Sequence, residues 1–340
     1  MDHLVSKLRD GVSLSREEAQ TAAGQLLDEG IAHEVKADFL LALRAKGETA
    51  AEMAGFAEAL LARALEPGID PAQLPGPIID VCGTGGDRLE LFNISTASMF
   101  ILAAGGAVVV KHGNRAITSQ CGGADVLEAL GARIELPPAD LRRCVETLGL
   151  GFVFAPAYHP AFQVIGPVRK ALAARGHATI FNLLGPILNP VRPARQLVGV
   201  FLAKALPVYA ETLQTLGRSR AWAVHGDGMD EISITAPSLA ADVTRDNISQ
   251  FTIDPRELGL EPAPIESLRG GNKAVNAAIL EGILAGEEAG PKRDITLLNA
   301  AAGFVVAELA PDLANGLELA REQLASGRAL AKLRALQAFR

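Results

Sequence analysis

Hydrophobic residues follow two different patterns along the chain. Up to about residue 70, alanine and leucine recur with a helical period behind Ser15-x-x-Glu18 and Thr49-x-x-Glu52, which have capping-box spacing. After the proline-rich link at Pro71–Pro77, short apolar runs alternate with helical patterns. This alternation is typical of a mostly parallel sheet covered by helices. We therefore expect an α/β fold, with a small helical domain and a larger α/β domain built on a mostly parallel central sheet.

The same pattern places the individual elements. Strands are expected at Ile78–Cys82, Val108–Val110, Arg133–Leu136, Phe152–Ala155, Gln196–Phe201 and Trp222–His225. Helices are expected at Ala124–Leu130, Ala139–Leu148, Leu206–Leu216, Ala274–Leu284 and Thr296–Leu309, with a last helix from about Leu317 to the end. Residues 242–264 form a polar span. Between Pro156 and Pro193, Gly and Pro crowd both ends of a segment whose one amphipathic helix is Val168–Arg175. We interpret this segment as an excursion that packs on the N-terminal helices, so the expected domains are 1–70 with about 160–193, and 71–159 with 194–340.

The stretch from Asp80 to Asp125 has the layout of a phosphate cradle. An apolar strand breaks into Gly83-Thr84-Gly85-Gly86-Asp87, polar Asn93, Ser95 and Thr96 open a helix, and a second strand enters Lys111-His112-Gly113-Asn114-Arg115. Glycines let backbone N–H groups close on an anion, and the helix N-terminus adds unpaired donors. Lys111 and Arg115 can add full positive charges.

Simpler interpretations of this stretch stay open. Glycine-rich turns also join buried strands without binding anything. A dinucleotide fingerprint is not met, because Arg88 stands where its third glycine belongs, and no P-loop motif is present.

A second candidate site follows the strand at Trp222–His225, where Gly226 and Gly228 precede Asp230-Glu231. Adjacent carboxylates after a buried strand suit Mg²⁺, which takes one or two carboxylates together with waters and phosphate oxygens. They also suit a charged surface turn. Because ligands of such folds bind at the carboxyl ends of the strands, the glycine loop, the lysine loop and this acidic loop are expected at one sheet edge. Of the other polar residues, His159 fits a hydrogen-bonded structural role and Arg169 a solvated helix charge.

Composition excludes some classes of protein. The 340 residues carry a net charge of −7 and 49% hydrophobic residues, so the chain does not resemble a nucleic-acid or anionic-membrane binder. Its three cysteines form no C-x-x-C pair, which favours reduced thiols over a metal site. The N-terminus has no signal-peptide core, and the longest apolar stretch, Met99–Val110, is too short to span a bilayer. We expect a cytoplasmic protein with no nucleic-acid or membrane partner.

Taken together, these motifs resemble the anthranilate phosphoribosyltransferase family of the tryptophan pathway. The resemblance runs from about Gly11 to the final helix. It rests on GTGGD at 83–87, NIST at 93–96, KHGNR at 111–115, YHPA at 158–161, PVR at 167–169, FNLLGP at 181–186, HGDGMDE at 225–231, LRGG at 268–271 and NAAIL at 276–280. The family implies a fold of the nucleoside phosphorylase and phosphoribosyltransferase type, a homodimer formed through the helical domains, and transfer of phosphoribose from 5-phosphoribosyl 1-diphosphate to anthranilate with Mg²⁺.

The resemblance also implies a set of site residues. The donor site would hold Gly83, Gly85, Gly86, Asp87, Asn93, Ser95, Thr96, Lys111 and Ser119. The acceptor tunnel would hold His112, Asn114, His159, Arg169 and Gly185, and the matching motifs add Gly113, Arg115, Gly123 and Tyr158 as substrate-binding residues. Ser95, Asp230 and Glu231 would bind the metal. The implied catalytic residues are Lys111, Asn114 and Arg169.

Several positions depart from the family's usual residues. Leu91 and Gly123 stand where the family often has a hydroxyl residue, and Ala178 replaces a frequent Arg. Arg88, Leu89 and Glu90 make the glycine loop bulkier. These departures bear more on the acceptor than on the donor. Alternatives are therefore a phosphoribosyltransferase or pyrimidine nucleoside phosphorylase of the same fold with another acceptor, or a catalytically silent relative that binds nucleic acid.

The chemistry expected of this family needs no strong base before attack, because an aromatic amine is neutral at pH 7. The difficult event is departure of diphosphate from C1 of the ribose. Charge stabilisation by Mg²⁺ and Lys111, together with alignment of the acceptor by Arg169, Asn114 and His159, would supply most of the catalysis.

Overall fold

The computed structural model of the protein describes residues 1–87, 89–116 and 120–340. Its centre is a seven-stranded sheet in the order β3-β2-β1-β4-β5-β6-β7. The strands are β1 (Ile78–Gly83), β2 (Val108–Gly113), β3 (Leu150–Phe154), β4 (Arg195–Gly199), β5 (Arg220–His225), β6 (Ser238–Thr244) and β7 (Ile248–Ile253). β1 to β5 run parallel, and β6 and β7 add an antiparallel edge. The mostly parallel sheet predicted from the sequence is confirmed.

Helices cover both faces of this sheet. Those of the α/β part are α5 (Ile94–Ala104), α6 (Gly123–Ala129), α7 (Pro138–Leu148), α11 (Leu206–Thr215), α12 (Lys273–Ala285), α13 (Pro291–Val306), α14 (Leu313–Ala325) and α15 (Arg328–Ala338). Strand residues alternate between two cores. Leu197 and Trp222 belong to the core that includes α5 and α13, whereas Val198 and Ala223 belong to the core that includes α11 and the N-terminal helices. Burial on both faces explains why these strands read as continuous apolar runs.

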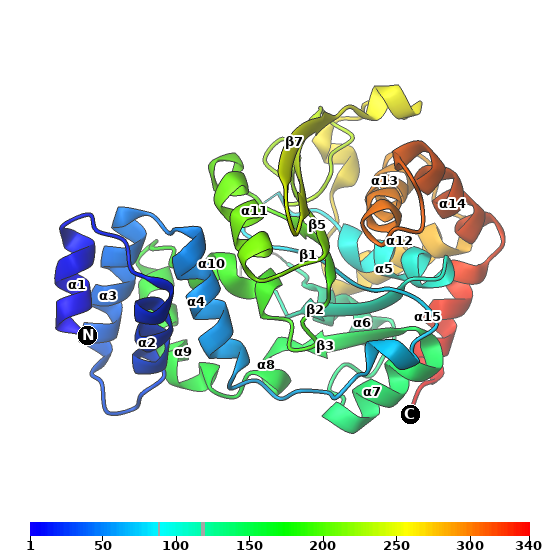
Figure 1. The fold of residues 1–340 in the computed structure, drawn as a ribbon. Helices are drawn as coiled ribbons and strands as arrows, with labels where there is room; N and C mark the ends of the chain where they lie inside the picture. The colour runs from blue at the N-terminus through cyan, green and yellow to red at the C-terminus, as the bar shows by residue number, and fades with distance from the viewer. Residues whose placement is uncertain (88, 117–119) are drawn as a thin grey trace.

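A helical bundle lies beside the sheet. It consists of α1 (Asp2–Arg9), α2 (Arg16–Leu26), α3 (His33–Lys46) and α4 (Ala50–Leu61), joined by α8 (Ala155–Tyr158), α9 (Phe162–Ala174) and α10 (Phe181–Leu184) from the excursion. Figure 1 shows α1 to α4 and α9 gathered at one end of the molecule, with α4 facing the sheet, and α12 to α15 at the other end. Short 3₁₀ turns complete the chain at Pro71–Gln73, Gly185–Leu188, Ala203–Ala205, Pro255–Leu258 and Ile265–Leu268.

Both predicted capping boxes are present. Glu18 N–H donates to Ser15 Oγ over 3.2 Å while Ser15 N–H donates back to Glu18 over 2.7 Å. Thr49 and Glu52 repeat the arrangement at the start of α4. Each box satisfies two N–H groups that a helix start leaves unpaired, which fixes where α2 and α4 begin.

Two element predictions are wrong, and one strand was missed. Residues 133–136 form no strand, because buried Ile134 and Leu136 alternate with exposed Arg133 and Glu135 on an extended segment without a partner strand. The polar span contains β7 and the last residues of β6. The final helix is two helices, α14 and α15, separated at Gly327, whose φ of 72° ends a regular helix. Among the described residues, no helix is long and apolar enough to cross a bilayer.

Candidate active site

The glycine loop, the end of β2 that carries Lys111, and the acidic loop meet at the carboxyl edge of the sheet. Gly83 ends β1, Lys111 lies near the end of β2, and Asp230 and Glu231 follow β5. Gly85 N–H donates to Asp230 Oδ2 over 2.6 Å, which joins the glycine loop to the acidic loop. The prediction that these loops converge is confirmed for their described residues.

Close packing at this edge depends on glycine. A Cβ on Gly83 would lie 2.6 Å from Asp230 Cγ, a separation that real Cβ atoms do not tolerate. A Cβ on Gly199, at the end of β4, would lie 3.0 Å from Asp230 Cα. The acidic loop therefore lies directly on the ends of β1 and β4, where a side chain would displace it.

Lys111 is buried between β1 and α5. Its Nζ donates to Val81 O over 2.5 Å and to Ser95 Oγ over 3.1 Å. Glu231 accepts a hydrogen bond from the Ser95 main-chain N–H. A cationic nitrogen, a hydroxyl and a carboxylate thus meet at the first turn of α5, where the helix dipole favours negative charge.

The two adjacent carboxyl groups are unfavourable as a pair of free anions. Desolvation, with the charge of Asp87, raises the pKa of Asp230 to about 7. Desolvation and the charge of Asp230 raise the pKa of Glu231 to about 8, although Lys111 opposes the change. A divalent cation would remove this repulsion, and the oxygen donors present are those that Mg²⁺ prefers.

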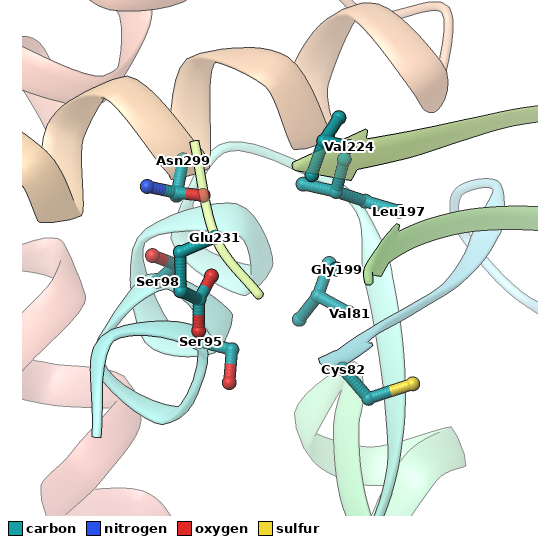
Figure 2. A pocket seen from close by; sticks show the side chains of 9 residues that line it. All are labelled: Val81, Cys82, Ser95, Ser98, Leu197, Gly199, Val224, Glu231 and Asn299. Carbon is teal, nitrogen blue, oxygen red and sulfur yellow. The ribbon is translucent and has the colours of Figure 1, made fainter. Parts of the chain in front are cut away.

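The metal site is open rather than a closed protein cage. Within residues 1–87, 89–116 and 120–340, no three His, Cys, Asp or Glu side chains form a group that could hold a metal by themselves. Figure 2 shows Glu231 extending toward Ser95, with Ser98 beside them. A space of about 10 Å³, enough for about one water molecule, adjoins these residues. A cation here would need further oxygen ligands from a bound phosphate or from water.

A cavity of about 410 Å³ begins at Gly83 and Thr84 and extends to the helical bundle. It is lined by Cys82, Gly83, Thr84, His112, Gly113, Asn114, Ala155, Pro156, His159, Phe162, Gln163, Arg169, Phe181, Asn182, Gly185, Pro186 and Leu188. The cavity therefore brings together Gly83, Gly113 and all five residues predicted for the tunnel. It is large enough for a small aromatic molecule.

Arg169 provides the positive charge of this cavity. Its guanidinium lies over the rings of Phe181 and Phe162, at 4.9 Å and 5.9 Å from their centroids. No carboxylate of the described residues lies within 4.0 Å of it. Stacking holds the guanidinium flat while its N–H edge stays available to an anion. This environment differs from that of a solvated helix charge.

Other predicted residues take up different positions. The Tyr158 hydroxyl donates to Leu136 O over 2.8 Å in the core, so Tyr158 does not line the cavity. Arg115 pairs with Glu128 and Glu135 and stacks on Phe154, 5.1 Å from its centroid.

Near the donor end, Asn93 donates to Cys121 O over 3.0 Å, and Thr96 is buried. A Cβ on Gly123 would lie 3.1 Å from Thr96 Oγ1. Gly85 and Gly86 have φ values of 68° and 92°, which glycine adopts without strain. Ser119 and Arg88 lie outside the described residues.

Several cavity residues were not predicted from the sequence. Phe162, Phe181 and Asn182 belong to the excursion; the FNLLGP motif contains Phe181 and Asn182, but neither they nor Phe162 were assigned to the site. Asp80 and Gln196 form hydrogen bonds with His112 and Pro186, which line the cavity. Both residues interrupt apolar strands in the sequence. A polar residue inside a buried strand is a usable signal, because such a residue needs a partner.

Comparison with known proteins gives a consistent result. Residues 75–330 match the family described as glycosyl transferase family, a/b domain, and residues 2–64 match its helical bundle domain. The anthranilate phosphoribosyltransferase of Haloferax volcanii is 45% identical over 338 residues, covering 99% of both chains. That of Rubrobacter xylanophilus is 45% identical over 96% of this chain and 94% of its own.

Solved structures are similar over nearly the whole chain. The crystal structure of anthranilate phosphoribosyltransferase from Thermus thermophilus has a TM-score of 0.92 and 40% identity, covering 99% of this chain and 98% of that one. The Saccharomyces cerevisiae enzyme in complex with PRPP and Mg has a TM-score of 0.86 and 26% identity, covering 99% and 97%.

Proposed function

The chain belongs to the anthranilate phosphoribosyltransferase family, and from that premise we propose how its residues divide the two substrates between them. The reaction transfers the 5-phosphoribosyl group of phosphoribosyl diphosphate to the amine of anthranilate and releases diphosphate, a step of tryptophan biosynthesis. The donor binds at the glycine loop, and anthranilate enters the neighbouring cavity. The observation that carries this proposal is the 410 Å³ cavity, which extends from Gly83 to an unpaired guanidinium at Arg169.

The donor end combines backbone and charged groups. Gly83, Gly85 and Gly86 let the main chain of the loop approach the diphosphate closely, and the Gly86 N–H can donate to it. The first turn of α5, with Asn93, Ser95 and Thr96, receives phosphate oxygens at its positive end. Lys111 places a full charge beside them. Ser119 and Asp87 complete the set implied by the family resemblance.

Mg²⁺ is the cofactor that fits the acidic loop. Asp230, Glu231 and Ser95 would hold it, directly or through water, and diphosphate oxygens would fill its remaining positions. The support is the hard-oxygen donor set and the raised pKa values of both carboxyl groups, which a divalent cation would lower. When bound, the ion neutralises charge on the departing diphosphate.

The acceptor end aligns the nucleophile. Arg169 binds the carboxylate of anthranilate through its free N–H edge, and Asn114, which lines the same cavity, orients the ring. The amine is neutral at pH 7, so its nitrogen attacks C1 as the C1–O bond to diphosphate breaks. Phe162 and Phe181 exclude water that would otherwise hydrolyse the donor.

The test follows the fluorescence of anthranilate. Purified protein should remove it only when phosphoribosyl diphosphate and Mg²⁺ are both present, with one diphosphate released per anthranilate consumed. Parallel reactions offer other aromatic amines, and thymidine with phosphate. Turnover of one of those substrates without anthranilate turnover would overturn the assignment. DNA binding that weakens with salt, without any turnover, would support the silent relative instead.

Assembly and location follow from the same premise. The helical bundle, residues 1–70 with about 160–193, would form a homodimer contact, and the α/β part would be the second domain. The cell compartment would be the cytoplasm, in keeping with three free, buried thiols. Sedimentation equilibrium of the purified protein tests the dimer, and a monomer at micromolar concentration would reject it.

A further inference from the structure

One wall of the acceptor cavity is a short segment, residues 183–189, held by side chains from outside it. We call it the wall segment. Gly185, Pro186 and Leu188 of this segment line the cavity. Four of its carbonyl groups accept hydrogen bonds: Leu183 O from Tyr209 Oη (2.7 Å), Gly185 O from His112 Nδ1 (2.9 Å), Pro186 O from Gln196 Nε2 (2.5 Å) and Leu188 O from His159 Nε2 (2.8 Å).

The end of the wall segment is fixed as well. Asn189 Nδ2 donates to Asp80 Oδ2 over 3.0 Å and to Val110 O over 2.8 Å. Asp80 also accepts from the main-chain N–H of His112 over 3.1 Å. A single buried carboxylate therefore connects β2 with the end of the wall segment.

The segment depends on these donors because of its own conformation. It runs from α10 into a 3₁₀ turn, and Pro186 contributes no N–H. Carbonyl groups at the end of a short helix have no partner within it, and burial without a partner costs free energy. The donors come from β2, β4, α11 and the end of α8, so the position of the wall is set by its neighbours.

The hydrogen bonds also define the state of the two histidines. A carbonyl oxygen only accepts, so the hydrogen is on Nδ1 of His112 and on Nε2 of His159. Burial lowers the pKa of His112 to about 3 and that of His159 to about 4, so both rings are neutral at pH 7. The rings contact each other edge to face at 5.4 Å. His112 Nε2 is buried and has no hydrogen-bond partner among the described residues.

We propose that His112 and His159 are positioning residues of the acceptor site. Each donates a hydrogen bond that fixes the wall segment of the cavity that Arg169 also lines, and neither takes the proton of the amine. The amine proton passes to solvent after the N–C1 bond has formed. This inference rests on the proposed function, because the wall segment matters to turnover only if the cavity holds the acceptor.

The test compares alanine with a conservative amide at each position. His112→Asn keeps an N–H group near the place of Nδ1, and His159→Gln keeps one near the place of Nε2, yet neither amide is a base. His112→Ala and His159→Ala should raise the KM for anthranilate by about 10- to 100-fold, the effect of one unsatisfied buried carbonyl. The KM for phosphoribosyl diphosphate should change by less than about threefold. Each amide variant should have an anthranilate KM at least tenfold lower than that of the alanine variant at the same position.

A proton-acceptor role predicts a different result. In single-turnover reactions, the rate constant of the chemical step would then fall as much in His112→Asn as in His112→Ala. Added imidazole would restore the rate of the alanine variant in proportion to the concentration of imidazole free base. Either observation overturns the proposal, and so does an alanine pair with wild-type KM values. His33→Ala is the matched control, because His33 is exposed at the start of α3.

A second variant covers the case in which an alanine variant does not fold. Gln196 is fully buried and does not line the cavity. Gln196→Glu removes the donor to Pro186 O but keeps an acceptor for Arg218 Nε, which now bonds to Gln196 Oε1 over 3.1 Å. It should raise the anthranilate KM with little change in donor KM, and an unchanged anthranilate KM would reject the proposal. A wild-type enzyme that consumes no anthranilate would instead reject the proposed function and this inference together.

Discussion

Gly83→Ala is a direct test of the contact between the end of β1 and the acidic loop. The new Cβ would lie 2.6 Å from Asp230 Cγ and 3.0 Å from Asp230 O, whereas ordinary contacts are 3.4–4 Å. The Asp230 carboxyl must therefore retreat by about 1 Å, a displacement that costs about 10²-fold in rate when it misplaces a catalytic group. Its main chain cannot follow easily, because the Asp230 Cα packs against Gly199.

The expected result has two parts. Overpacking should lower the free energy of unfolding by about 1–3 kcal/mol. Loss of the Gly85 N–H bond to Asp230 should lower kcat by about 10²-fold and raise the Mg²⁺ concentration for half-maximal rate. Product formation across a Mg²⁺ titration and urea unfolding measure both effects on the same preparation.

Gly282→Ala is the control. Gly282 lies inside α12, and its added Cβ would meet Glu288 Cβ at an ordinary 3.7 Å. Alanine there should stabilise the protein by about 0.5–1 kcal/mol and leave turnover unchanged. If Gly83→Ala keeps the wild-type rate and Mg²⁺ response, the absence of a side chain at Gly83 is not what positions Asp230 for turnover.

Four further outcomes are expected. The double variant Asp230→Asn/Glu231→Gln should depress turnover and lose its response to Mg²⁺, and an unchanged Mg²⁺ dependence would reject these ligands. The pKa values of Asp230 and Glu231 are about 7 and about 8 without metal, so Mg²⁺ binding at pH 7 should release protons, and the Mg²⁺ affinity should increase up to about pH 8.5. Calorimetry in buffers of different ionisation enthalpy detects the proton release. Arg169→Ala should raise the anthranilate KM about 10- to 100-fold and spare donor affinity, while equal loss of both would indicate a structural role. Because the pKa values of His112 and His159 are lowered in the folded protein, the unfolded chain binds more protons between about pH 4 and 6.5, and the free energy of unfolding falls as pH falls. In His112→Asn, the decrease in this free energy from pH 7 to pH 5 should be about 2 kcal/mol smaller than in the wild type. Urea unfolding at both pH values measures the difference.

The parallel part of the fold was predictable because its strands have a strong local signal. β1 and β4 are buried on both faces and read as apolar runs between helical patterns. β7 has the burial of a half-exposed edge strand, and its Ser249 and Gln250 hide it within a polar span. Edge strands pair on one side and face water, so their composition resembles that of a loop.

Alternation shows which residues are buried but not whether a strand has a neighbour. Residues 133–136 alternate as a strand would, with Ile134 and Leu136 in the core, yet no ladder forms there. Pairing depends on long-range neighbours that local pattern does not contain. The same limit applies to the cavity, because Arg169 lies over Phe162 and Phe181 only once α9 and α10 have packed on the helical bundle.

Glycines lie at the ends of three neighbouring strands, which is more than a phosphate-binding loop alone requires. Gly83 and Gly199 end adjacent parallel strands, and Gly226 directly follows the next one. An added Cβ on Gly226 would lie 2.7 Å from Ser233 N, so this glycine also makes room for the chain around the acidic loop. Glycine at three successive strand ends therefore indicates main chain crossing the sheet edge at close range. Because that crossing brings Asp230 to the glycine loop, one set of small residues positions both the phosphate-binding turn and the carboxylates beside it.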